Sequence, residues 1–176
     1  MILICYDGSA DAQSAIDHAA RLLPGAPATV LTVWETFVDL MSRSAAGAAW
    51  MGAPGDGAEF DRAAREAAEA GAREGAERAG AGGLNATPAI RARSTSIAEA
   101  ILAEADEIDV DAILLGSRGL TGVKSLFLGS VSHAVLQHAG RPVIVVPSPA
   151  VATRRMAHRA DAAVSSGDPA PDRTSA

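Results

Sequence analysis

The sequence has few aromatic residues, one cysteine and no long hydrophobic run. Aromatics make up 3% of its 176 residues, although hydrophobic residues make up 48%, so we expect a core of Val, Ile, Leu and Ala. The single Cys5 cannot form an internal disulfide, and no apolar run approaches the ~20 residues that span a bilayer. The N-terminus lacks the basic region and cleavage site of a signal peptide. Together these absences predict a cytoplasmic protein without a membrane segment.

The sequence also has fewer basic than acidic residues. The chain has 15 Lys and Arg against 21 Asp and Glu, and its net charge is −6. Proteins that bind nucleic acid or anionic membranes usually carry a basic patch, so neither partner is expected. Cys5 lies in an apolar run without a basic neighbour, which favours a buried core residue over a reactive thiol. With one cysteine and no cluster of histidines or acids, we expect no protein metal site.

Short apolar runs alternate with segments of helical periodicity. The predicted strands are residues 2–6, 28–34, 87–93, 111–116 and 143–146. The predicted helices are residues 12–23, 58–80, 97–105 and 130–139. Strands that alternate with helices form parallel sheets covered on both faces. The sequence therefore predicts an α/β, Rossmann-like fold, with a five-stranded parallel open sheet and four helices on its two faces.

Two segments are predicted to lie outside these elements. Residues 42–57 are rich in Ala, Gly and Ser and predict a loop. Residues 148–176 contain almost no large apolar side chain and predict a disordered tail. The folded domain is therefore expected to be residues 1–147.

The segment after the fourth predicted strand is rich in glycine. Ligands of open parallel sheets bind where the strands end, and this segment follows such an end. Gly129-Ser130 begins a predicted helix, whose N-terminus favours an anion, and Arg118 and Lys124 could offset phosphate charge. We interpret residues 116–130 as a polyphosphate site that Gly116 and Gly129 leave open; taken alone, the glycines would slightly favour the simpler interpretation that they shape a turn. The spacing fits neither a Walker loop nor a dinucleotide fingerprint.

The pattern Gly116-x2-Gly119-x9-Gly129-Ser130 resembles the ATP-binding signature of the universal stress protein family. The opening strand that runs into Tyr6-Asp7-Gly8-Ser9 resembles the family as well, and the resemblance covers residues 1–147. It implies the strand order 3-2-1-4-5 and dimerisation through the last strand. Residues 94–96 depart from the family pattern, which often has a Gly-x-Pro-like turn there.

The resemblance also implies roles for individual residues. Asp7 would bind the ribose hydroxyls, and backbone groups of Tyr6 and Val33 would bracket the adenine. Gly116, Arg118 and Gly119 would wrap the phosphates. The far end of the phosphates would lie against Ser130, Val131 and Ser132.

Three functions are compatible with the sequence. The first is an ATP-binding regulatory protein of the stress response, which binds ATP or AMP with any Mg²⁺ carried by the nucleotide and which is not an enzyme. The second is a slow ATPase or autophosphorylating enzyme, for which no residue that would position water is evident. The third is a protein that keeps the fold but binds no nucleotide, which the intact glycine pattern disfavours. The apolar strand Val143–Val146 predicts a homodimer through a sheet edge.

Overall fold

A computed structural model describes residues 1–43, 57–120 and 128–166, with side chains up to residue 158. Its strands are β1 (Ile2–Cys5), β2 (Pro27–Trp34), β3 (Asn85–Ala92), β4 (Ala112–Gly116) and β5 (Val143–Val146). Its helices are α1 (Ala10–Leu22), α2 (Phe37–Arg43), α4 (Gly57–Ala81), α5 (Ile97–Glu107), α6 (Ser130–His138) and α7 (Pro149–Ser166). Along the described residues, no helix is long and apolar enough to cross a bilayer.

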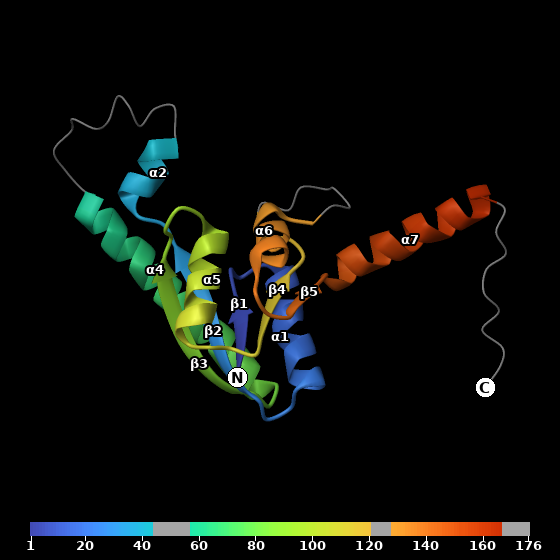
Figure 1. Ribbon diagram of the computed structural model, residues 1–176, viewed down its shortest axis with the longest axis horizontal. Helices are drawn as coiled ribbons and strands as arrows, with labels where there is room; N and C mark the ends of the chain where they lie inside the picture. The colour runs from blue at the N-terminus through green and yellow to red at the C-terminus, as the bar shows by residue number, and fades with distance from the viewer. Residues whose placement is uncertain (44–56, 121–127, 167–176) are drawn as a thin grey trace.

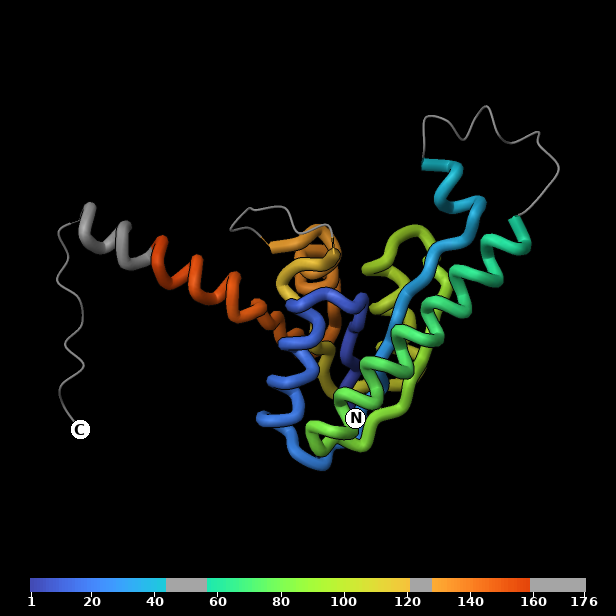
Figure 2. Tube along the Cα trace, turned by 180° about the vertical axis from the view of Figure 1, so that it is seen from behind, coloured from blue at the N-terminus to red at the C-terminus, as the bar shows by residue number. Residues whose placement is uncertain are grey.

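The strands form one parallel sheet in the order β3-β2-β1-β4-β5, which confirms the predicted fold class and strand order. Helices α5 and α6 lie over the face seen in Figure 1, and α1 and α4 lie over the face seen in Figure 2. The helix count is the one difference, because the structure has six helices in its described part where four were predicted.

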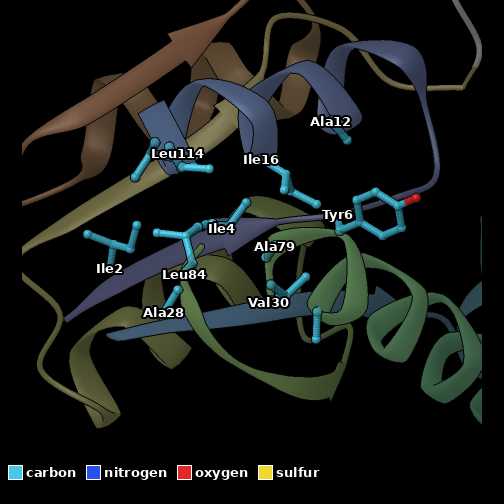
Figure 3. Close-up of a cluster of buried hydrophobic side chains, with 13 residues drawn as sticks. Ile2, Ile4, Tyr6, Ala12, Ile16, Ala28, Val30, Ala79, Leu84 and Leu114 are labelled. Atoms are coloured by element: carbon cyan, nitrogen blue, oxygen red, sulfur yellow. The ribbon is translucent and has the colours of Figure 1, made fainter. Parts of the chain in front are cut away.

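The core is divided between the two faces by the alternation of side chains along each strand. In β1, Ile2 and Ile4 pack under α1 and α4, in the cluster drawn in Figure 3, whereas Leu3 packs under α5 and α6. The buried hydrophobic side chains are aliphatic apart from Tyr6, as the low aromatic content predicts.

Helices α1 and α5 begin at capping side chains. Ser9 caps α1 by accepting a hydrogen bond from the Ala12 N–H (3.2 Å), and Ser96 caps α5 by accepting one from the Glu99 N–H (3.0 Å). The Ser-Thr-Ser segment at 94–96 thus ends in a helix cap. This cap places the first turn of α5 beside the end of the sheet.

Helix α2 was not predicted. Thr36 Oγ1 accepts a hydrogen bond from the Asp39 N–H (3.2 Å) and donates one to Asp39 Oδ2 (2.8 Å), an arrangement typical of a helix start. Phe37 packs edge-on against Phe60 of α4, with ring centroids 5.6 Å apart. The predicted loop at 42–57 is therefore wrong at its first two residues, which end α2, and at Gly57, which begins α4; residues 44–56 lie outside the described part.

The predicted disorder from residue 148 is also wrong for residues 149–166, which form α7. The prediction rested on the small number of large apolar side chains, which argues against packing. The segment is nevertheless rich in Ala and Arg, which favour a helix, and proline is common in the first turn of a helix, where Pro149 lies. Val151 is buried and attaches the first turn to the domain. Beyond it, α7 runs away from the other elements in both views (Figures 1 and 2).

Candidate functional site

A cavity of about 330 Å³ lies at the edge of the sheet where β1, β2 and β4 end. Its volume is in the range of small-molecule sites, about 300–1,000 Å³. The structure brings all ten residues of the predicted site to its wall. They are Tyr6, Asp7, Val33, Gly116, Arg118, Gly119, Gly129, Ser130, Val131 and Ser132. Lys124, also named from the sequence, lies outside the described residues.

One wall of the cavity is apolar, and most of it was not predicted as part of the site. Leu31 and Leu115 reach it from the sheet, and Ile97 and Ile101 from α5. In the sequence these residues read only as core positions of a strand or a helix. Their convergence follows from the crossover connection, which packs α5 against β2 and β3. A flat apolar ring fits such a wall.

Cys5 lies in the same wall and behaves as a core residue. Burial, and to a lesser extent the nearby Asp7 carboxylate, raise the pKa of its thiol to about 12. The thiol is therefore protonated at neutral pH, in agreement with the sequence interpretation.

Asp7 stands exposed at the mouth of the cavity. Its Oδ1 accepts a hydrogen bond from the Ser9 N–H (3.0 Å), which holds the turn between β1 and α1. Its Oδ2 lies so close to Gly119 that a Cβ on that residue would be 2.7 Å away. Gly119 thus leaves room for the Asp7 carboxylate, and the two predicted residues form one feature of the site.

Tyr6 contributes to the cavity through its backbone. Its side chain lies on the opposite face of the sheet (Figure 3), where the hydroxyl donates a hydrogen bond to Glu74 Oε1 (2.7 Å). Its N–H donates to the Leu31 carbonyl (2.8 Å), and its carbonyl accepts from Thr32 Oγ1 (3.0 Å). The N–H is therefore engaged in the sheet, and the carbonyl, with a second lone pair, is the group left for a ligand.

The other end of the cavity is formed by the N-terminus of α6. Gly129 is the N-cap, and the N–H groups of Ser130, Val131 and Ser132 form the first turn, which has no intrahelical acceptors for them. Ser132 is 4% exposed, and its hydroxyl donates a hydrogen bond to the Gly116 carbonyl (2.7 Å). Its proton is thus committed, and Ser132 can offer a phosphate only its backbone N–H.

The sequence predicted that Gly116 leaves space for the phosphates. The structure gives this glycine a different role, in the packing of β4 against α1. A Cβ there would lie 2.7–2.8 Å from backbone atoms of Asp11 and Ala12 in α1. Gly116 is therefore needed for the close approach of β4 to α1. At Gly129 a Cβ would meet the Ser117 carbonyl oxygen at 3.3 Å, a tight but less severe contact.

Sequence comparison relates the whole domain to known proteins. The model of the universal stress protein family matches residues 1–147. The protein named "Universal stress protein in QAH/OAS sulfhydrylase 3'region" from Thermus aquaticus is 35% identical over 147 residues, which are 82% of this chain and 96% of that protein.

Solved structures share the fold. Protein MJ0577 of Methanocaldococcus jannaschii has a TM-score of 0.66 at 24% identity, covering 83% of this chain and 94% of that one. A universal stress protein in complex with cAMP has a TM-score of 0.52 at 20% identity, covering 84% and 95%. One from Archaeoglobus fulgidus in complex with dAMP has a TM-score of 0.50 at 22% identity, covering 82% and 95%. From the match over residues 1–147 and the Thermus aquaticus relative, we conclude that this chain belongs to the universal stress protein family.

Proposed function

We propose that the cavity binds an adenine nucleotide, ATP in the first place, and that the protein acts in the cytoplasm as a nucleotide-dependent regulator of the stress response. The observation that carries this proposal is the convergence of the ten residues, from four separate segments of the chain, on one cavity. Universal stress proteins of the same fold in complex with cAMP and dAMP support it.

The cavity offers a different chemistry for each part of a nucleotide. The apolar wall with Leu31 and Ile97 suits the base, and the exposed Asp7 carboxylate at the mouth suits the ribose hydroxyls. The first turn of α6 and the Arg118 guanidinium suit the phosphates, because helix N-termini and arginine both favour anions. Any Mg²⁺ would arrive with the phosphates, since no group of three potential ligand side chains occurs within the described ranges.

An ATPase or autophosphorylating enzyme is the second candidate. Phosphoryl transfer needs a residue to orient the nucleophile and a group to stabilise developing charge. Arg118 could serve the second purpose. Among the described residues of the cavity wall, Asp7 is the one carboxylate, and Ser9 holds it at the turn after β1. Phosphate release faster than about 1 per second would favour the enzyme.

Asp7→Asn tests the assignment of the ribose end. The amide oxygen can still accept from the Ser9 N–H, so the turn and the melting temperature should be retained. Loss of a charge-assisted hydrogen bond costs about 1.5–3 kcal/mol, so ATP affinity should fall about 10- to 100-fold. Tripolyphosphate, which has no ribose, should bind the variant and the wild type equally in calorimetric titrations. Equal ATP affinity in the two proteins would refute the role of Asp7.

We also propose a homodimer through β5. This strand is at the edge of the sheet, with β4 as its neighbour, and Val143 and Val145 are half-buried. An open apolar edge favours pairing with a second copy about a two-fold axis. Light scattering should give twice the chain mass both for the full chain and for a shortened chain that ends at Ser148. A full-length monomer that dimerises only after shortening would show that the segment after β5 covers the edge.

A further inference from the structure

A buried carboxylate lies behind the phosphate end of the cavity. Asp11, in the first turn of α1, is 5% exposed. Its Oδ2 accepts a hydrogen bond from the hydroxyl of Ser117 (2.7 Å), which is fully buried. The same oxygen lies 3.9 Å from Nε of Arg118, whose side chain is 15% exposed and lines the cavity. Asp11 therefore contacts both residues that separate Gly116 from Gly119.

This contact is held in place by the surrounding backbone. Gly116 packs directly on the backbone of Asp11, and Ser9 Oγ donates to the Arg118 carbonyl (3.4 Å). The Ser117 N–H donates to the Val146 carbonyl (2.7 Å), which ties the segment to β5. Asp11 thus faces Arg118 across a rigid junction, so a change of charge at Asp11 acts on Arg118 at short range.

The contact is a property of this chain rather than of the glycine pattern. Ser117 and Arg118 occupy the two positions that the pattern Gly-x2-Gly leaves free, and Asp11 lies outside it. Ser9 caps α1, and Asp11, in the first turn of that helix, adds a negative charge next to Ala12 of the cavity wall.

We propose that Asp11 determines how strongly the site discriminates among nucleotides by their number of phosphates, a role that rests on the proposed function. Among the described residues of the cavity wall, Arg118 is the cation that would face incoming phosphates, and Asp11 attracts the same guanidinium. A negative charge beside that cation offsets part of its attraction for an anion. The offset grows with the charge of the ligand, so it weakens binding of ATP more than that of AMP. Adenosine, which has no phosphate, is unaffected.

The test compares Asp11→Asn with Asp17→Asn. Asparagine keeps an acceptor for Ser117 and removes the charge. Asp17 lies on the same helix but pairs with Arg78 on the exposed side, so its variant makes an equal change in net charge away from the cavity. Calorimetric titrations with ATP, AMP and adenosine should show ATP binding about three- to tenfold tighter in Asp11→Asn, a smaller gain for AMP and none for adenosine. Asp17→Asn should match the wild type for all three ligands.

A second variant tests whether Asp11 acts through Arg118. In an Arg118→Gln background, Asp11→Asn should lose most of its effect on ATP, which a double-mutant cycle measures. If Asp11→Asn does not fold, Asp11→Ser, also neutral and tolerated in a first helical turn, replaces it in both experiments.

The outcomes separate the inference from the function on which it rests. ATP affinity that is unchanged or lower in Asp11→Asn, or a change of equal size for all three ligands, would overturn the role of Asp11 while leaving nucleotide binding intact. A wild-type protein that binds none of the three would overturn the proposed function itself.

Discussion

Gly116→Val is expected to destabilise the protein by about 3 kcal/mol or more and to abolish nucleotide binding. The new Cβ would lie 2.7–2.8 Å from backbone atoms at the start of α1, which cannot move aside as a flexible side chain could. Overpacking in a tight core costs typically 1–3 kcal/mol, and two branching methyl groups add to it. Displacing α1 would also break the hydrogen bond between Ser117 and Asp11, so the phosphate end of the cavity would be lost with the stability.

Gly140→Val is the matched control. Gly140 is exposed after α6, and a Cβ there would meet nothing within 4 Å. Its variant should melt within a few degrees of the wild type, since surface substitutions usually change stability by less than about 0.5 kcal/mol. Urea unfolding of both variants measures the difference. Equal stability of Gly116→Val and Gly140→Val would contradict the close packing of β4 on α1.

Gly75→Ala is expected to destabilise the protein by about 1–3 kcal/mol, although alanine favours helices. Gly75 lies in the C-terminal half of α4, where a Cβ would approach Val30 Cγ1 to 2.8 Å and Tyr6 Cγ to 2.9 Å. Val30 is fully buried and stiff, and the Tyr6 ring is fixed by its hydrogen bond to Glu74. Neither side chain can move aside without a cost in free energy, so α4 would have to move away from the sheet.

Gly80→Ala makes the same substitution in the same helix with the opposite expected sign. A Cβ at Gly80 would meet nothing within 4 Å, so the variant should gain about 0.5–1 kcal/mol from the better helix propensity. Thermal melts of the two variants should therefore move in opposite directions. A gain of stability in both would show that α4 lies farther from the sheet than the structure has it.

The fold was predictable because its strands are short apolar runs, such as Ile2–Cys5 and Val143–Val146, between clear helical stripes. Helix α2 was not predicted because it buries no residue, so its sequence has no apolar stripe at helical spacing. The sequence feature that indicates this helix is the pair Thr36 and Asp39, whose spacing of three residues is typical of a helix N-terminus. Helix α7 was not predicted because the sequence was judged by the apolar residues available for packing, whereas helix propensity accounts for most of the length of α7.

The candidate site was predictable where a residue type at a fixed spacing carries the chemistry, as in Gly119 and Gly129. Its apolar wall was not, because Leu31 and Ile97 are ordinary core residues until the fold brings them to one cavity. The contact of Ser117 with Asp11 joins residues 106 positions apart. No local sequence pattern predicts a contact between residues so far apart. The requirement for glycine at position 116 likewise depends on the packing of β4 against α1, which only the structure shows.

Calorimetric titration of the nucleotide-free protein with ATP tests the central claim most directly. We predict saturable binding of one ATP per chain with a Kd in the micromolar range, on the order of −8 kcal/mol, because an apolar wall, a carboxylate and a helix N-terminus meet in one cavity. Absence of binding at ATP concentrations up to about 1 mM, in protein whose melting curve shows it to be folded, would contradict the account.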